Sequence, residues 1–306
     1  MTHIVVTEEV REALDDGLPV VALESTIFRH LGLPAPSNAE ALDRCIAAIR
    51  GEGAVPAVTA VLDGTPRVGI DVDEHHRILG PARKTAARDL PVAVGQGWEV
   101  GATTVSAALT LAAAAGVEVF ATGGIGGVHR GAELTGDVSA DLGALATHPI
   151  VTVCAGAKVF LDLPRTLEHL EMIGVPVLGW RTDELPGFTT PTSGLPVPHR
   201  VEDADDVVRI VRAGRALGMT TGVLVAVPVP DDAGVPPEEI DRALTDALAA
   251  AEEGGLRGAE VTPYVLERIA EATDGRSIPA NLALAEQNAG VAARIAARLR
   301  QSAERR

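Results

Sequence analysis

The chain alternates short apolar runs with longer stretches in which apolar residues recur every three or four positions. Short apolar runs bounded by glycine or proline are typical of buried strands, and the longer spacing is typical of helices with one buried face. Strands and helices that alternate in this way predict an α/β fold, with a largely parallel sheet flanked by helices. The sequence shows neither internal repeats nor a low-complexity linker, so a single domain over residues 1–306 is expected.

The predicted elements alternate along the chain. Strands are expected at Pro19–Leu23, Ala57–Leu62, Arg67–Ile70, Pro91–Val94, Glu118–Thr122, Ile150–Cys154, Pro176–Gly179 and Thr221–Val227. Helices are expected at Asn38–Arg50, Thr104–Ala115, Leu163–Ile173, Ala204–Ala216, Pro237–Glu253, Pro263–Thr273 and Ile278–Gln301. The pair Asp63-Gly64 predicts a tight hairpin turn. Two segments, Gly123–Ser139 and Arg181–Arg200, are longer than ordinary connections and are candidates for functional loops.

Composition and charge narrow the class of protein. Hydrophobic residues make up 46% of the 306 positions, enough for a sizeable core. The net charge of −16, without a basic cluster, argues against nucleic acid or an anionic membrane as a partner. Cys45 and Cys154 predict buried free thiols in a reducing compartment. The chain shows no signal peptide and no membrane-spanning run, so the cytoplasm is the expected location.

Two lysines are candidates for chemistry. Lys84 and Lys158 are the only lysines among 26 Lys and Arg residues. A guanidinium stays protonated at any accessible pH, whereas a buried amine can lose its proton and act as a nucleophile or Schiff-base former. Lys158 follows the predicted strand Ile150–Cys154 among small residues, so it is the first candidate for covalent chemistry. Lys84 lies in a basic stretch, where it is either part of a solvated face or a partner of Lys158.

Two further candidates follow predicted strands. Glu24 comes directly after Pro19–Leu23, at the edge of the sheet where ligands gather, and is a possible general acid or base. A hydrogen bond from Glu24 to a neighbouring loop is the alternative. Residues Gly101–Thr104 precede a predicted helix whose free N–H groups could hold an anion, and simple capping by Thr103 is the alternative.

The segment Thr122–Arg130 carries four glycines within five positions, so its backbone can approach a ligand closely. It lacks the G-x-G-x-x-G spacing of a dinucleotide site. His129 in this segment could bind phosphate or hydrogen-bond within the loop. Asp137 and Asp141 lie four residues apart with few basic neighbours, which suits Mg²⁺ or Mn²⁺ that keeps most of its waters. Asp141 could instead cap a helix that begins near Leu142.

The combination of motifs resembles the pseudouridine-5'-phosphate glycosidase family. The segments that carry the resemblance are Ala22–Thr26, Lys84–Pro91, Gly101–Val105, Gly123–Asp141, Cys154–Lys158, Thr182–Pro186 and Asn281–Leu284. They occur in order across nearly the whole chain. The resemblance implies an enzyme that reversibly cleaves the C–C glycosidic bond of pseudouridine 5'-phosphate to uracil and ribose 5-phosphate. It also implies a homotrimer with one divalent ion per subunit, usually Mn²⁺, with Mg²⁺ or another divalent ion as the alternative.

The resemblance also implies roles for single residues. Lys158 matches the covalent nucleophile, which forms a lysine-linked ring-opened ribose adduct, Glu24 matches the proton donor, and Asp137 matches the metal-binding acid. The positions that match substrate-binding residues are Lys84, Val105, Ser139, Ala140 and Asp141, with His129 and Asn281 as further pocket candidates. The chain departs from the family at Thr189–Gly194, which lacks an aromatic residue and an arginine, and by one extra residue in Gly95–Val100. These departures concern specificity for the base.

The chemistry of a C-glycoside agrees with this assignment. A C-glycoside has no heteroatom leaving group, so the paired carboxylates of an ordinary glycosidase are insufficient. An amine can open the ribose and expel the base as an iminium forms, provided that the ring carbon of the base is protonated. Two other classes remain open from the residues alone: a Schiff-base sugar-phosphate aldolase or lyase, and a non-catalytic sugar-phosphate sensor.

Overall fold

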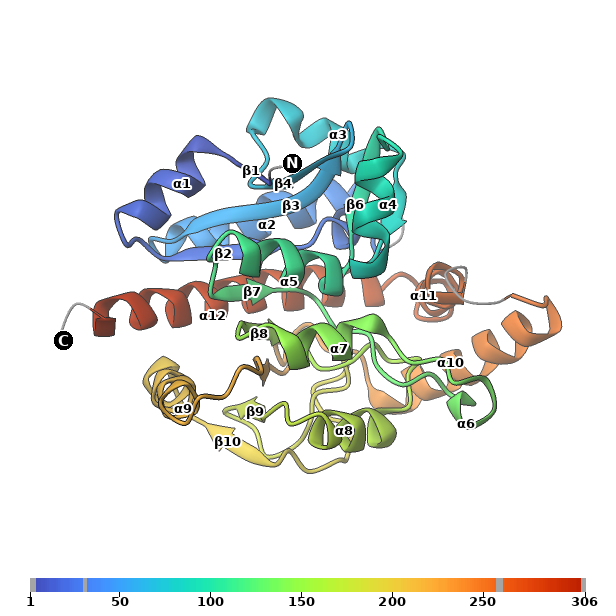
Figure 1. Cartoon of the computed structure of the whole chain (residues 1–306). Helices are drawn as coiled ribbons and strands as arrows, with labels where there is room; N and C mark the ends of the chain where they lie inside the picture. Colours follow the sequence, from blue (N-terminus) through green and yellow to red (C-terminus); the bar gives the residue numbers. More distant parts are fainter. Residues whose placement is uncertain (1–3, 30–31, 257–260, 304–306) are drawn as a thin grey trace.

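The apolar runs become the strands of one sheet in a computed structural model that describes residues 4–29, 32–256 and 261–303 (Figure 1). Within these residues the 11 strands run in the order β1-β4-β3-β2-β7-β8-β11-β9-β10, and β6 joins β5 to β3. The strands are β1 (Val5–Val6), β2 (Val20–Leu23), β3 (Val55–Leu62), β4 (Thr65–Val68), β5 (Arg83–Thr85), β6 (Val100–Thr103), β7 (Val119–Ala121), β8 (Val151–Cys154), β9 (Val177–Trp180), β10 (His199–Val201) and β11 (Val223–Ala226).

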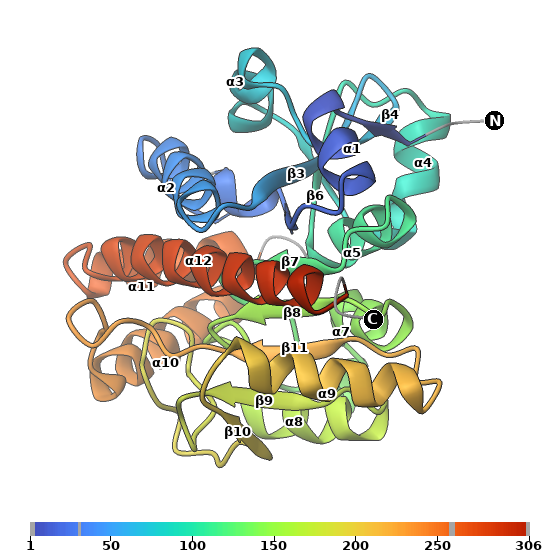
Figure 2. The same ribbon diagram turned by 90° about the vertical axis from the view of Figure 1, so that its left-hand side faces the viewer.

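Helices cover both faces of this sheet. The α-helices are α1 (Glu8–Asp15), α2 (Ser37–Gly51), α3 (His75–Leu79), α4 (Leu90–Gly95), α5 (Val105–Ala114), α6 (Ala132–Thr135), α7 (Ala140–Thr147), α8 (Leu163–Met172), α9 (Ala204–Ala216), α10 (Pro237–Glu253), α11 (Val261–Ala272) and α12 (Ser277–Ala303). Helices α2, α9 and α12 pack on one face, and α5, α7 and α8 cover the other (Figures 1 and 2). Among the described residues, no helix has both the length and the apolar character needed to cross a membrane.

The register of the parallel strands brings three chain segments to one edge. Leu23 of β2 lies opposite Ala121 of β7, which lies opposite Val153 of β8. The residues that follow these strands therefore leave the sheet side by side at its carboxyl edge. Helix α2 follows β2 on one face, whereas α7 follows β7 on the other (Figure 2). Such a change of face between neighbouring strands marks the place where open α/β sheets bind ligands.

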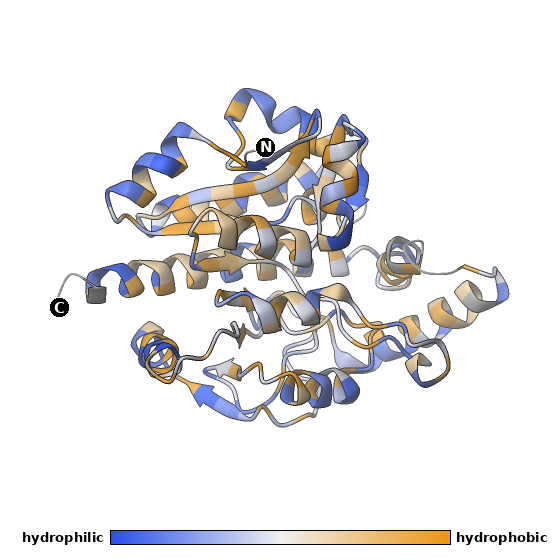
Figure 3. Ribbon diagram, viewed as in Figure 1, coloured by the Kyte–Doolittle hydropathy of each residue, from blue (hydrophilic) through white to orange (hydrophobic). Residues whose placement is uncertain are grey.

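Amphipathic helices form around this sheet because their apolar positions share one face. Helix α9 buries Val207, Val208 and Val211, and its N-cap residue Asp203 accepts a hydrogen bond from the backbone N of Asp206 at 3.0 Å. Figure 3 shows hydrophobic colour concentrated along the strands and mixed colour on outer helices such as α1 and α9. The buried apolar side chains from the sheet and from both helical layers form one core cluster.

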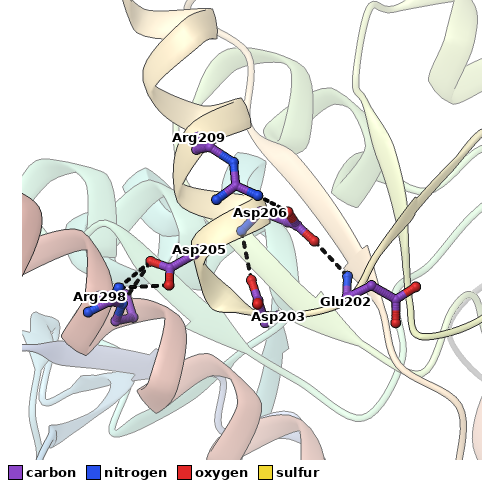
Figure 4. Close-up of polar contacts among 6 residues, drawn as sticks. All are labelled: Glu202, Asp203, Asp205, Asp206, Arg209 and Arg298. Carbon is purple, nitrogen blue, oxygen red and sulfur yellow. Dashed lines mark hydrogen bonds and ion pairs between the residues drawn. The ribbon is translucent and has the colours of Figure 1, made fainter.

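Ion pairs fix α12 to the start of α9 (Figure 4). The Arg298 guanidinium donates to both carboxylate oxygens of Asp205, at 2.5 and 2.7 Å. Asp206 accepts a hydrogen bond from the backbone N of Glu202 at 2.8 Å and pairs with Arg209. The Arg298–Asp205 pair connects the C-terminal part of α12 to α9, while the packing of α12 against α2, β7 and β8 places its earlier turns below the carboxyl edge of the sheet.

The predicted fold class is confirmed: the central sheet is mostly parallel, is flanked by helices and belongs to a single domain. All predicted helices and all but one predicted strand agree with the structure to within two residues at each end. The predicted hairpin turn is also confirmed, because Asp63 and Gly64 have φ angles of 50° and 70° between the antiparallel strands β3 and β4.

One predicted strand is wrong. Residues Pro91–Val94 lie in α4, although their β-branched composition favours a strand. The carboxylate of Asp89 accepts a hydrogen bond from the backbone N of Ala86 at 3.0 Å, and this turn leads into α4 with Pro91 in its first turn, where proline is compatible with a helix. The sequence prediction also missed α1 and the short strands β5, β6 and β10, because few residues in them alternate clearly.

Candidate active site

A cavity of about 470 Å³ opens at the carboxyl edge of the sheet, beside β2, β7 and β8. Its volume is in the usual range for a small-molecule site. One side, built by α2, α11, α12 and the turn after β2, is mainly apolar and includes Leu33, Ala41, Leu266 and Ala285. The other side, built by β5, α5, α7 and the loop after β7, carries the charged and hydroxyl groups. The cavity therefore has an apolar wall that faces a polar wall.

Lys158 reaches this cavity because the chain turns sharply after β8. Gly156 has a φ angle of 82°, and a Cβ at this position would lie 2.3 Å from the carbonyl oxygen of Pro186, so only glycine fits. The backbone N of Lys158 donates to the carbonyl oxygen of Ile125 at 3.1 Å, which ties the lysine to the glycine-rich loop after β7. This turn delivers the predicted nucleophilic amine to the cavity.

Lys84 lines the same cavity from β5, which pairs with β6, the strand that leads into α5. Its side chain is exposed at the surface of the cavity. Partial desolvation by the surrounding protein lowers the pKa of Lys84, and the charge of Lys158 lowers it further. The carboxylates of Asp141, Glu24 and Asp137 act in the opposite direction. The structure thus brings both lysines of the chain and three acids within electrostatic range of one another.

Glu24 follows β2 and is almost completely buried, with 1% of its surface exposed. The hydroxyl groups of Thr26 and Thr122 donate to its two carboxyl oxygens. Burial raises the pKa of Glu24, whereas the charge of Lys158 and the two hydroxyl groups lower it. A buried carboxyl group with a raised pKa retains its proton to a higher pH than a solvated one, which suits a general acid.

Asp141 connects the two loops that form the polar wall. Its carboxylate accepts hydrogen bonds from the backbone N of Ser106 and of Gly126, each at 2.9 Å. The alternative role as a helix cap near Leu142 is wrong, because α7 begins two residues earlier and Ser139 caps it by accepting from the backbone N of Asp141 at 3.2 Å. The backbone bonds of Asp141 hold the start of α5 against the glycine-rich loop.

The start of α5 also faces the cavity. Its N-cap is Thr104, which lines the cavity together with Ser106. Thr103 does not cap the helix, so this alternative is wrong: its hydroxyl group is buried and donates to the carbonyl oxygen of Thr59 at 2.8 Å. The side chain of Val105 is 1% exposed, so a contact with a ligand would have to come from its backbone N–H.

Asp137 lies on the cavity wall with 48% of its side chain exposed, and His129 Nδ1 lies 3.7 Å from its Oδ2. Burial lowers the pKa of His129, and Asp137 acts in the opposite direction. In the described part of the chain, no group of three or more His, Cys, Asp and Glu side chains could enclose a metal ion. A hard divalent ion that keeps most of its waters needs only one or two carboxylates, so Asp137 fits such an ion better than zinc.

Comparison with known proteins shows which family this chain belongs to. Residues 9–298 match the family model described as indigoidine synthase A like protein. The chain belongs to the indigoidine synthase A-like family. A relative from Methylobacterium nodulans named pseudouridine-5'-phosphate glycosidase is 49% identical over 295 residues, with 95% of this chain and 87% of the relative covered. A protein of the same name from Herpetosiphon aurantiacus is 47% identical over 304 residues, with 99% of this chain and 100% of the relative covered.

Two solved structures of similar proteins share the fold over nearly full length. The prealnumycin C-glycosynthase AlnA, in complex with ribulose 5-phosphate, superposes with a TM-score of 0.91 at 34% identity, and the match covers 100% of both chains. An indigoidine synthase A-like protein from Thermotoga maritima superposes with a TM-score of 0.88 at 35% identity, with 98% of both chains covered. The sheet and its flanking helices are therefore shared within the indigoidine synthase A-like family.

In this member of the indigoidine synthase A-like family, the fold brings most of the predicted site residues to one cavity. Those that line it are Lys84, His129, Asp137, Ser139, Ala140, Asp141, Lys158 and Asn281. Glu24 lies directly behind the wall, and the hydroxyl group of Thr26 connects it to the cavity surface. The side chain of Val105 is buried between two residues that do line the cavity.

Sequence reasoning missed Phe188 and Thr122. The ring of Phe188 lies in the cavity wall against the loop after β7, where a Cβ on Gly124 would come within 2.7 Å of Phe188 Cδ2. Phe188 has a φ angle of 65°, a conformation that a bulky residue rarely adopts and that marks a functional position. A conformational outlier leaves no signal in a single sequence. Thr122 could have been singled out from the sequence, because it stands at the end of a predicted strand, as Glu24 does.

Proposed function

We propose that this protein cleaves the C–C glycosidic bond of pseudouridine 5'-phosphate, in a reversible reaction that gives uracil and ribose 5-phosphate. The relatives that it matches over nearly full length are named for this substrate. The observation that carries the proposal is the convergence of Lys158 and Glu24 at one cavity, close enough for the charge of Lys158 to act on Glu24. An amine nucleophile and a proton donor can together cleave a C-glycoside.

In the first step, the lone pair of Lys158 Nζ forms a bond to the anomeric carbon of the ribose. The bond from that carbon to the ring oxygen breaks. The oxygen takes up the proton that the nitrogen releases, so the oxygen becomes a hydroxyl group and the nitrogen regains its lone pair. The sugar is now an open chain that is linked covalently to the lysine. Lys158 suits this step because its turn delivers the amine into the cavity, where the glycine-rich loop leaves room for a sugar.

In the second step, the nitrogen lone pair forms an iminium while the bond between the sugar and the base breaks. The electron pair of that bond stays with the ring carbon of uracil, which takes the proton that Glu24 supplies. Water then adds to the iminium and releases ribose 5-phosphate and the free lysine. Glu24 suits this step because burial raises its pKa and its two hydroxyl partners hold its orientation.

We also propose that each subunit binds one divalent metal ion. Mn²⁺ is the first choice and Mg²⁺ is the alternative. Asp137 would hold it, because its carboxylate is exposed on the cavity wall, whereas both oxygens of the Asp141 carboxylate already accept backbone hydrogen bonds. Such an ion, held by Asp137, would supply positive charge for the phosphorylated substrate.

The proposal extends to assembly and location. We propose a homotrimer, the assembly that the resemblance to the pseudouridine-5'-phosphate glycosidase family implies. We also propose a cytoplasmic location. Cys45 and Cys154 are free and buried, as predicted, and burial raises the pKa of each thiol to about 12. Unreactive free thiols of this kind suit a reducing compartment.

Product analysis and covalent trapping test the function together. Incubation of pseudouridine 5'-phosphate with the protein and Mn²⁺ should release a product with the mass and ultraviolet spectrum of uracil. Borohydride reduction in the presence of ribose 5-phosphate should leave a stable sugar adduct on Lys158, located by peptide mass spectrometry. Lys158→Arg should abolish both, because a guanidinium keeps its proton and cannot form an iminium.

Each other outcome would reject a defined part of the proposal. Turnover without modification of Lys158 would reject the covalent route. Release of a carbonyl fragment from other sugar phosphates, without uracil from pseudouridine 5'-phosphate, would indicate an aldolase or lyase. Binding that survives in Lys158→Arg, with no product from the wild type, would indicate a sensor.

A further inference from the structure

Behind the cavity, hydrogen bonds connect three buried residues: the Thr122 hydroxyl group donates to the Glu24 carboxyl group, and the Asn288 side chain donates to the backbone carbonyl oxygen of Thr122. They are 1%, 2% and 0% exposed, and they come from the ends of β2 and β7 and from the middle of α12. Glu24 is the proton donor of the proposed reaction. Neither Thr122 nor Asn288 is among the described residues that line the cavity. Thr122 can act on the reaction through Glu24, and Asn288 can act through Thr122 and through Gly123, which lines the cavity.

Asn288 fixes the backbone at the end of β7. Its Nδ2 donates to the carbonyl oxygen of Thr122 at 2.9 Å and to that of Gly123 at 3.3 Å. On the opposite side, the backbone N of Thr122 donates to the carbonyl oxygen of Val153 in β8 at 3.0 Å. With both backbone groups held, and with χ1 restricted at a β-branched residue, the hydroxyl group of Thr122 has few directions available. The direction that it takes leads to Glu24 Oε1.

The orientation of the Asn288 amide leaves one of its polar atoms without a hydrogen bond among the described residues. Its Oδ1 is buried and has no hydrogen-bond partner in the described structure. The amide cannot turn over, because its oxygen would then face the two carbonyl oxygens that its NH₂ group now serves. Buried polar atoms are nearly always paired, and an exception of this kind calls for an explanation beyond packing. An apolar residue would avoid this penalty at a site that packs beside Leu284 and Val291 in the core.

Orientation matters because the Glu24 carboxyl group is held at both oxygens. Thr26 donates to Oε2 from the cavity side, and Thr122 donates to Oε1 from the sheet side. Two donors in fixed positions define the plane of the carboxyl group and therefore the direction in which its proton points. Proton transfer to a ring carbon depends strongly on such alignment, and small displacements of a reacting group reduce rates by orders of magnitude.

We propose that Asn288 and Thr122 are positioning residues that hold the carboxyl group of Glu24 in line with the base carbon in the cavity. This inference rests on the proposed function, because it assigns Glu24 as the acid that protonates the leaving base. It also assigns a positioning role to α12, because Asn288 of this helix acts on Glu24 through two successive hydrogen bonds although Asn288 does not line the cavity.

Thr122→Val tests the inference, because valine keeps the shape of threonine and removes the hydroxyl group. We expect kcat to fall by about 10-fold to 100-fold, since the carboxyl group loses one of its two donors. The hydrogen bond from Thr122 lowers the pKa of Glu24, so its removal should raise that pKa. The acid form is the active one and activity is lost as the pH rises through this pKa, so the alkaline limb of the kcat profile should move to higher pH.

Three companion variants separate positioning from general damage. Thr122→Ser retains a hydroxyl group and should recover the pH profile and most of kcat. Asn288→Leu should shift the profile in the same direction as Thr122→Val, because it frees the backbone that orients Thr122. Thr152→Val is the matched control, because Thr152 is fully buried in β8 and its hydroxyl group has no partner in the described structure. This control should retain the wild-type kcat and pH profile.

Trapping of ribose 5-phosphate on Lys158 with borohydride completes the test, since formation of that adduct needs no proton on a base carbon. We expect Thr122→Val and Asn288→Leu to trap the adduct as the wild type does, while cleavage is slowed. An unshifted pH profile in Thr122→Val, or an equal loss of trapping and cleavage in both variants, would overturn the inference. Absence of both trapping and uracil release in the wild type would instead reject the proposed function.

Discussion

At the scale of single residues, opposing effects act on the pKa of Glu24. Burial raises this pKa, the charge of Lys158 together with two hydroxyl groups lowers it, and burial is the larger effect, so the carboxyl group keeps its proton to a higher pH than a solvated carboxyl group. Lys84 shows the complementary case, since burial and a second amine lower its pKa. Opposite charges buried at one cavity are typical of sites where a proton moves.

Glu24→Gln removes the acid and keeps the shape of the side chain. The hydroxyl groups of Thr26 and Thr122 can still bond to an amide, so the fold should be retained. We expect kcat for the release of uracil to fall by about 10²-fold to 10⁴-fold, the usual contribution of a general acid. Steady-state kinetics and a thermal melt check this expectation. Wild-type cleavage by a well-folded Glu24→Gln protein would exclude Glu24 as the proton donor.

At the scale of elements, the polar wall depends on the close approach of the glycine-rich loop to α7. A Cβ on Gly126 would lie 2.2 Å from Ser139 Oγ and 2.8 Å from Asp141 Oδ2. The loop can therefore donate its backbone N–H to Asp141 only because the side chain is absent. The same carboxylate holds the start of α5, so the geometry of two helices and one loop depends on this contact.

Gly126→Ala should disturb this junction. We expect a loss of about 1–3 kcal/mol in the free energy of unfolding, the usual cost of overpacking, and a fall in kcat/KM for pseudouridine 5'-phosphate. Gly143→Ala is the matched control, because Gly143 lies within α7 with nothing within 4 Å of an added Cβ. It should stabilise the protein by about 0.5–1 kcal/mol. Chemical denaturation and kinetics compare the two, and equal stabilities would contradict the packing argument.

At the scale of the whole molecule, a protein with a net charge of −16 is proposed to bind a doubly charged phosphate. Its overall field opposes that binding, so the attraction has to be local. Lys84 and the start of α5 supply positive charge and N–H groups within one cavity, and the proposed metal ion would add to them. The phosphate then anchors the substrate and its binding energy positions the reacting carbon.

Removal of the phosphate from the substrate tests this argument. We expect kcat/KM for pseudouridine to be at least about 100-fold below that for pseudouridine 5'-phosphate, because several charge-assisted contacts are lost. Lys84→Met should lower kcat/KM for the nucleotide by about 10-fold or more and leave the value for the nucleoside nearly unchanged. Similar values for both substrates in the wild type, or a parallel loss for both in Lys84→Met, would show that Lys84 does not serve the phosphate.

Much of the candidate site could be predicted because the chemistry depends on residue types that are rare in this chain. Lys158 stood out as one of two lysines, and Glu24 stood out because it directly follows an apolar run. Thr122 and Asn288 could not be connected to Glu24 in this way, since they lie 98 and 166 residues from their partners in these hydrogen bonds. Phe188 could not be singled out from the sequence, because what distinguishes it is its backbone φ angle and its packing against Gly124.

The sequence by itself determined the class of fold and the order of its elements, because hydrophobic periodicity and turn residues such as Asp63-Gly64 act locally along the chain. Local rules could not decide that Pro91–Val94 becomes a helix, since the preceding turn, in which Asp89 accepts from the backbone N of Ala86, and the surrounding packing override its strand-like composition. Only the tertiary structure decided which groups meet. Strand register places Glu24 beside Thr122, and α12 brings Asn288 beneath them, because long-range pairing and burial join segments that are remote in the chain.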